Sequence, residues 1–261
     1  MKNIYKLGLS IFLLFCSTLM NAQAFQGKAV YLYFNNYSDV DWGKKNMSDA
    51  DIAMWKGKLS QESQTSFELL FTLNESNWTE VASLSVEGGK GNSTQWGKPL
   101  NKLYYKNFED QTYMIEAELF DKAFLVKDVL ETPSWELTNE TKTIGKYSAT
   151  KAIWQVVEEV KAFGSEETES VTKEIVAWYT SEIPIPQGPE RYWGLPGLIL
   201  EIQNGPITYI CEQVTLNPSE PIKLRIPKKG ELVRQKELEA IAAEKMEEVL
   251  LKYNKTGKGK G

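Results

Sequence analysis

The sequence contains no histidine among its 261 residues. Nucleophilic catalysis by a Ser-His-Asp or Cys-His arrangement is therefore excluded, because both need an imidazole as general base. Zinc and copper sites that use histidine ligands are excluded for the same reason. Histidine is also the side chain that titrates near neutral pH, so no histidine switch exists. This one absence removes many classes of hydrolase and metalloenzyme.

Long hydrophobic runs are also missing, apart from one near the N-terminus. Residues 7–19 are mostly apolar, they follow Lys2 and Lys6, and they precede the small-x-small pattern Ala22-Gln-Ala24. This order is typical of a secretory signal peptide, and the apolar run is short for a membrane span. We therefore expect a signal peptide over residues 1–24. The remaining chain should be exported to the periplasm or associated with the outer membrane, with no transmembrane span.

Cysteine is nearly absent. Cys16 lies within the expected signal peptide, which leaves Cys211 alone in the exported chain. An internal disulfide is then impossible, so the hydrophobic core has to hold the fold together. Cys211 lies in the apolar segment 207–216, where we expect a small buried side chain on a strand.

Charged and glycine-rich segments argue against further classes of function. The formal net charge is −5, and an acidic chain is a poor general partner for nucleic acid or an anionic membrane surface. Gly88-Gly-Lys-Gly91 lacks the spacing of a phosphate-binding loop, and the acids near Asp49 do not complete a calcium-binding loop. The sequence therefore predicts no catalytic residue, no metal site and no cofactor.

Short segments rich in β-branched and aromatic residues dominate the rest of the chain. They are separated by turn sequences such as Asn204-Gly205, which is typical of a β-hairpin. The expected strands lie at 28–34, 66–73, 78–82, 103–108, 113–120, 124–130, 135–138, 147–160, 171–180, 198–202, 207–216 and 222–226. Consecutive short strands predict an antiparallel sheet and not alternating β-α-β units.

Two helices are expected beside the strands. Ser48 and the acids after it are typical of a helix start, which predicts a short helix over 49–62. Apolar residues recur at three-to-four spacing over 231–253, which predicts a long C-terminal helix. Residues 25–255 should form a single β-rich domain, followed by a disordered basic tail over 256–261. The predicted fold is mainly β, a curved antiparallel sheet or partly open half-barrel with these two helices.

Aromatic residues are abundant, with eight tryptophans and twelve tyrosines. Trp178, Tyr192 and Trp193 gather near the apolar Leu195. In an exported β protein such residues either fill the core or line a cleft for sugars, lipids or peptides. Both interpretations stay open. The second makes Trp178, Tyr192, Trp193 and Leu195 candidate ligand contacts.

The stretch between the strands at 171–180 and 198–202 combines restricted and permissive backbones. Its glycines and prolines are Pro184, Pro186, Gly188, Pro189, Gly194, Pro196 and Gly197. Glycine adopts positive φ angles that other residues resist, whereas proline fixes φ and pushes the preceding residue toward extended geometry. We therefore expect a stiff crossing loop, shaped by its backbone, that is structural or forms the rim of a cleft.

Four spaced motifs give this region a family resemblance. They are GKYSATKA at 145–152, AWYTSEIPI at 177–185, Gly188-Pro189, and GLPGLI at 194–199. In this order they resemble the GLPGLI family, exported proteins of Bacteroidetes named after the hexapeptide. The resemblance covers 145–202 and implies an all-β scaffold of largely unassigned function, with no catalytic residue to carry over. By analogy, the scaffold looks like periplasmic half-barrel carriers that hold an apolar ligand on a curved sheet.

Three functions stay open at this point. The first is a non-enzymatic cell-envelope protein that binds an apolar or amphipathic ligand, or a partner segment, at the concave face of the sheet. The second is a carboxylate-dependent hydrolase of glycan or cell-wall material, which needs two carboxylates about 5–10 Å apart across a cleft. The third is a structural accessory of an outer-membrane complex, which predicts an exposed apolar patch.

Overall fold

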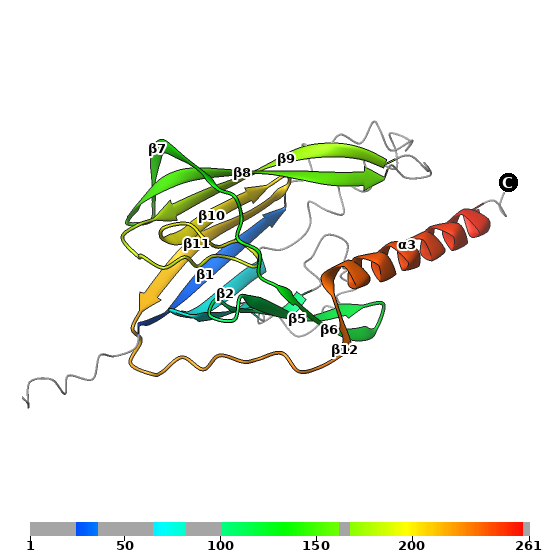
Figure 1. Ribbon diagram of the computed structural model, residues 1–261, viewed down its shortest axis with the longest axis horizontal. Coiled ribbons are helices and arrows are strands. Elements are labelled where there is room, and N and C mark those ends of the chain that lie inside the picture. The colour runs from blue at the N-terminus through cyan, green and yellow to red at the C-terminus, as the bar shows by residue number, and fades with distance from the viewer. Residues whose placement is uncertain (1–24, 36–64, 82–100, 162–167, 258–261) are drawn as a thin grey trace, which may run out of the picture.

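The computed structural model describes residues 25–35, 65–81, 101–161 and 168–257. Its strands form one open sheet in the order β12-β6-β5-β4-β3-β2-β1-β11-β10-β9-β8-β7 (Figure 1). All neighbouring strands are antiparallel except β12 and β6, which are parallel. The mainly β fold, as a sheet that does not close into a barrel, is therefore confirmed. Within the described ranges, no helix combines the length and apolar character that crossing a membrane requires.

Eleven of the twelve predicted strands are present. The observed strands are β1 (Gln26–Asn35), β2 (Thr65–Thr72), β3 (Glu75–Glu80), β4 (Asn101–Asn107), β5 (Thr112–Leu119), β6 (Lys122–Val129), β7 (Glu136–Ile144), β8 (Tyr147–Lys161), β9 (Thr168–Thr180), β10 (Leu198–Asn204), β11 (Ile207–Leu216) and β12 (Glu231–Val233). The Asn204-Gly205 turn joins β10 to β11 as predicted, and Gly205 has a φ of 56°. In the left-handed region glycine meets no Cβ penalty.

The predicted strand at 222–226 is wrong. Residues 222–225 alternate between half-buried and exposed, but Ile226 is exposed, and the segment crosses the sheet instead of lying beside a strand. Side chains from three strands bind its backbone: the N–H groups of residues 222, 225 and 228 donate to Gln26, Asn77 and Glu116. These bonds satisfy the backbone that a strand ladder would otherwise satisfy.

The C-terminal helix begins later than predicted. Glu231–Val233 pairs with Phe124–Val126 as β12, and helix α3 (Gln235–Gly257) follows it. Helical periodicity includes 231–233, but the open edge of β6 offers these residues a hydrogen-bonding partner that the sequence pattern does not reveal. The signal peptide at 1–24, the helix at 49–62 and residues 258–261 of the tail lie outside the described residues.

Two sequential antiparallel meanders build the sheet. Strands β1 to β6 follow one another in space, and so do β7 to β11, and β1 pairs with β11 where the two meanders meet. The chain leaves β6 near one end of the sheet and enters β7 at the other end. These strands are ten strand spacings apart, roughly 48 Å in a flat sheet.

The link between the meanders forces the sheet to curve. Residues 130–135 alone connect β6 to β7, and they reach at most about 25 Å when fully extended. This connection, called the cross-connection below, therefore spans the concave side of a strongly curved sheet. Figure 1 shows it running from β6 across the middle of the molecule to β7.

The concave face carries the core. One row of neighbouring residues crosses seven strands and is largely aromatic and branched: Ala29, Leu69, Trp78, Tyr104, Ile115, Val126 and Val233. The rings of Tyr31, Phe67 and Tyr209 surround Trp78 at centroid distances of 5.0–5.3 Å. Much of the aromatic excess therefore fills the core, in geometries that stabilise aromatic pairs.

The loop at 181–197, called the crossing loop below, packs onto this concave face. Its backbone makes three tight turns in which the N–H of one residue donates to the carbonyl two residues earlier, at 2.7–2.8 Å. The central residues of these turns are Pro184, Pro186 and Pro196. An inverse γ-turn needs φ near −75° at its centre, which the proline ring supplies in advance. The prolines thus shape the loop.

Glycines allow the crossing loop to lie close to its neighbours. A Cβ on Gly197 would lie 2.0 Å from the carbonyl oxygen of Thr180, and a Cβ on Gly188 would lie 2.8 Å from that of Tyr192. Gly194 has a φ of 90°, in the left-handed region. Glycine therefore occupies positions where a side chain would collide with neighbouring atoms, or where the φ angle is unfavourable for other residues.

We expect Gly197→Ala to destabilise the protein by about 3 kcal/mol, because the new methyl group meets rigid backbone and not a movable side chain. Urea unfolding measures this free energy. Gly145→Ala is the matched control: its Cβ would meet nothing within 4 Å, so only its φ of 58° is strained, at about 1 kcal/mol. Equal losses in the two variants would contradict the close contact.

Candidate functional site

The four predicted ligand contacts do not lie together. Tyr192, Trp193 and Leu195 belong to the crossing loop and are 2%, 9% and 1% exposed. Trp178 is half-buried on β9 between two core residues, so its side chain lies on the opposite, convex face. The first three could meet a ligand only if the loop left the sheet. A binding role for the four residues stays a prediction.

Trp193 joins three segments of the structure. Its Nε1 donates to the carbonyl of Glu131 at 3.1 Å, and its own carbonyl accepts from Trp135 Nε1 at 2.7 Å. Its ring lies 4.9 Å from that of Phe108, just beyond β4. In this structure Trp193 therefore fixes the crossing loop to the cross-connection and to the sheet.

A buried carboxylate lies beside Trp178 on the convex face. Glu201 is nearly inaccessible, and its two oxygens accept from Lys142 Nζ at 2.6 Å and Gln203 Nε2 at 2.7 Å. The Lys142 ammonium also lies 4.3 Å from the centroid of the Trp178 ring. The carboxylate is thus paired, and a cation already covers one face of the indole.

Glu201 alone does not supply the pair of carboxylates that the hydrolase hypothesis needs. Glu201 is the only buried acidic side chain in the described part of the chain, and glycosidase chemistry needs two carboxylates across a cleft. The same ranges hold no cluster of three or more side chains of the kinds that ligate metals.

Lys106 is the one buried cation of the described ranges. It lies on the concave face of β4 and is fully buried beneath the crossing loop. Its Nζ donates to the carbonyl of Gly188 at 2.7 Å and to that of Tyr192 at 3.4 Å. Residues 189–192 between them form a turn closed by Tyr192 N–H and Pro189 C=O, with Glu190 at a φ of 46°. Lys106 therefore binds the crossing loop to the sheet from below.

Burial lowers the pKa of Lys106 from 10.5 to about 7, although the nearby Glu190 carboxylate opposes this shift. Desolvation disfavours the charged ammonium, and a neighbouring negative charge favours it. Between pH 7 and 10.5 the unfolded chain binds a proton that the folded chain does not. Stability should therefore rise with pH across this window, and the burial cost should be fully present below pH 7.

We expect Lys106→Met to remove this dependence on pH. The difference in unfolding free energy between the wild type and the variant should change by about 1.4 kcal/mol per pH unit inside the window and stay constant below it. Denaturant titrations at several pH values measure it. The exposed Lys173→Met serves as control, and parallel pH profiles for the wild type and Lys106→Met would refute the assignment.

Cys211 is buried on β11, as predicted, and burial raises the pKa of its thiol to about 12. It borders a cavity of about 310 Å³ with Ile144, Leu200 and Val214. Because the thiolate is the reactive form, this cysteine behaves as a small core residue.

A larger pocket, of about 440 Å³, lies where β12 ends and α3 begins. We call it the edge pocket, and it is lined by Thr112, Lys127, Asp128, Val129, Leu232, Val233, Arg234 and Glu237. The pairing of β12 with β6 brings these residues together, because Val233 lies opposite Val126 and the chain then turns away from the strand. The last residues of β6 are left beside an open space.

Three of the four charged side chains of the edge pocket have partners within the protein. Asp128 pairs with Arg234 at 3.2 Å and accepts from the N–H groups of Val129 and Gln235. The hydrogen bond from Val129 is the main cause that lowers the pKa of Asp128, so its carboxylate stays ionised. Glu237 accepts from Arg234 N–H at 2.7 Å, and such bonds stabilise the start of a helix.

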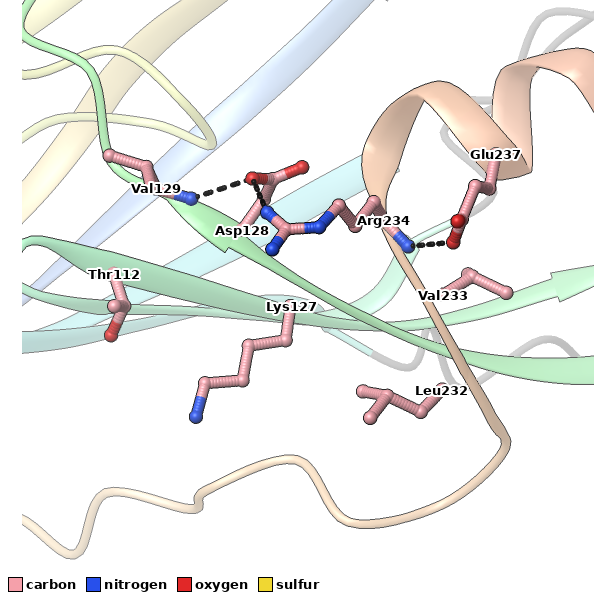
Figure 2. Close-up of a pocket in the computed structure, with 8 residues that line it drawn as sticks. All are labelled: Thr112, Lys127, Asp128, Val129, Leu232, Val233, Arg234 and Glu237. Atoms are coloured by element: carbon pink, nitrogen blue, oxygen red, sulfur yellow. Dashed lines mark hydrogen bonds and ion pairs between the residues drawn. The ribbon is translucent and has the colours of Figure 1, made fainter.

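Lys127 differs from the other charged residues of the pocket. Its ammonium has no hydrogen bond or ion pair to any residue that the structure describes. Figure 2 shows its side chain directed away from the Asp128–Arg234 pair, on the side of the strand where Leu232 lies. Val129 and Leu232 are 56% and 66% exposed. The pocket thus combines apolar walls with one lysine whose ammonium has no partner among the described residues.

Sequence reasoning missed the edge pocket and Lys106. The pocket unites residues about a hundred positions apart through β12, which the helical pattern concealed. Lys106 could have been found, because it shares the strand parity of Tyr104 and a lysine on a core-facing position is rare.

Comparisons with known proteins match part of the chain to a family of unassigned function. A family described as "Protein of unknown function (Porph_ging)" matches residues 135–201, which run from the residue before β7 into β10. No curated protein sequence is similar enough to this chain to count as a match.

Two solved structures of PNGF-II resemble the chain in part. The one in space group C2 has a TM-score of 0.48 at 13% identity, covering 84% of this chain and 33% of that one. The one in space group P21 has a TM-score of 0.45 at 14% identity, covering 76% and 29%. The chain therefore spans about a third of the length of these proteins.

Proposed function

We propose that this protein is a non-enzymatic, exported cell-envelope protein that binds an apolar or amphipathic ligand, or an apolar segment of a partner, without transforming it. The edge pocket carries the proposal: its apolar walls, Val129 and Leu232, lie next to Lys127, whose ammonium has no partner among the described residues. Such a site suits an amphipathic anion. The apolar body would cover the two side chains, and the anionic group would pair with the ammonium.

The edge pocket is a better location for the ligand than the concave face, where the sequence predicted it. Ile183, Ile185, Tyr192 and Leu195 of the crossing loop already fill that face. A ligand there would have to displace several buried apolar side chains and the hydrogen bonds of Lys106, whereas the edge pocket needs no such movement.

A binding role also agrees with the state of the buried polar groups. Lys106 and Glu201 are each engaged by two partners, and the Cys211 thiol is held in its protonated form. These groups stabilise loops and strands, and none of them faces the edge pocket. In the proposed function, the edge pocket therefore binds its ligand through shape, apolar area and one charge.

The proposal is tested with anilinonaphthalene sulfonate, an apolar dye with one anionic group. We expect saturable binding to the folded protein, reported by dye fluorescence. Leu232→Ser should weaken it roughly tenfold, because it removes much of the apolar wall. Leu137→Ser on β7 is the matched control, since Leu137 is 55% exposed and lies far from the pocket in the sheet order.

The charge requirement is tested separately. Lys127→Glu should weaken dye binding, and Lys146→Glu, an equal charge change in the β7–β8 turn, should not. Decanoate should displace the dye and decyl trimethylammonium should not, because only the carboxylate can pair with Lys127. Equal affinities for Leu232→Ser and Leu137→Ser would refute the edge pocket as the site.

A further inference from the structure

A basic segment crosses the convex face of the sheet, although the protein as a whole is acidic. Residues 221–230 contain four cations, Lys223, Arg225, Lys228 and Lys229, and no acid. All four side chains are exposed. Of these four cations, only Arg225 forms an ion pair with a described residue, a 3.4 Å contact with Glu116. We call this set the basic stripe.

The basic stripe is held in a fixed, extended shape. Asn77 bonds the residue 225 backbone on both sides: its Oδ1 accepts from N–H at 2.5 Å, and its Nδ2 donates to C=O at 2.9 Å. Pro221 and the buried Pro227 restrict the backbone further. From Lys223 to Lys229 an extended chain spans about 20 Å. The cations therefore lie along a preformed line, and binding a partner would cost little conformational entropy of this segment.

An apolar side chain lies within the line of charges. Ile226 is exposed between Arg225 and Lys228, although its neighbours Ile222 and Leu224 turn toward the sheet. Cations beside an exposed apolar group are typical of surfaces that rest on anionic membranes. The cations attract the headgroups, and the apolar group enters the boundary region.

The net charge of −5 does not prevent such docking. The Debye length is about 8 Å at physiological ionic strength, so acids on the far side of the protein are screened at the contact. The nearest flanking acids in the chain are Glu220 and Glu231, and Lys122 pairs with Glu231 at 2.6 Å. Glu116 lies against the stripe and pairs with Arg225, which leaves Lys223, Lys228 and Lys229 as exposed cations without an ion pair to any described residue.

We propose that the basic stripe docks the protein, by its convex face, on a membrane surface that carries anionic phospholipids. This inference does not depend on the ligand of the edge pocket. The charge and the apolar side chain of the stripe suit an anionic membrane as the partner of the convex face. Docking in this way would turn the convex face of the sheet toward the membrane.

Co-sedimentation of residues 25–261, without the expected signal peptide, with vesicles tests the proposal. We expect binding to vesicles of phosphatidylglycerol and phosphatidylcholine, little binding to phosphatidylcholine alone, and loss of binding at high salt. The double variant Lys228→Gln, Lys229→Gln should bind roughly 25-fold more weakly, about fivefold for each cation. Both lysine side chains are exposed, so the substitutions should not disturb the fold. Circular dichroism and the unfolding temperature verify this.

The control is Lys146→Gln, Lys173→Gln, which changes the net charge equally on the β7–β9 part of the sheet and should bind vesicles like the wild type. Ile226→Ser should weaken binding to anionic vesicles but not to dextran sulfate, a soluble polyanion. Equal binding to both vesicle types, or an equal loss in the control, would overturn the proposal. Vesicle binding unchanged by Ile226→Ser would overturn it in favour of a site for soluble polyanions.

Discussion

The six-residue cross-connection determines the architecture of this protein. It joins β6, the second strand from one end of a twelve-stranded sheet, to β7 at the other end, and its length forbids that sheet from lying flat. The concave face, the enclosed core and the position of the crossing loop follow from this limit. The indole N–H groups of Trp135 and Trp193 bond the cross-connection and the crossing loop to each other, so the span is also fixed in place.

The concave face is occupied by the protein itself. In a half-barrel carrier this face would hold an apolar ligand, whereas here proline-centred turns present Ile183, Ile185 and Leu195 to the sheet. A buried lysine is a costly way to secure such a loop, because its ammonium loses its hydration. The two carbonyls and Glu190 offset this cost. Surfaces for other molecules are then left at the sheet edge and on the convex face.

Local patterns in the sequence predicted most of the sheet, because hairpin turns and strand alternation depend on neighbouring residues. Eleven strands and the Asn204-Gly205 hairpin followed from them. The errors occur where partners are distant in the chain. At 222–226 side chains of other strands replace a ladder, and at 231–233 the edge of β6 overrides helical periodicity.

The residues of the candidate site are also separated by contacts between distant parts of the chain. Tyr192, Trp193 and Leu195 share one loop, and their burial depends on how that loop folds back over the sheet. Trp178 lies on the preceding strand, β9, where strand alternation directs its side chain to the convex face. The edge pocket and the basic stripe depend on where a long connection passes, which no local pattern encodes.

The sheet order has a consequence for how the chain folds. Within each meander every strand pairs with its sequence neighbour, so both halves can form from contacts that are short along the chain. The seam between β1 and β11 differs: Gln26 bonds Asn217, 191 residues further on. Closure entropy makes such contacts slow to form. Until β11 is available, the first meander has an unpaired inner strand with a hydrophobic face. Folding should therefore complete only after almost the whole chain is synthesised, and the incomplete half-sheet is the species most prone to aggregate.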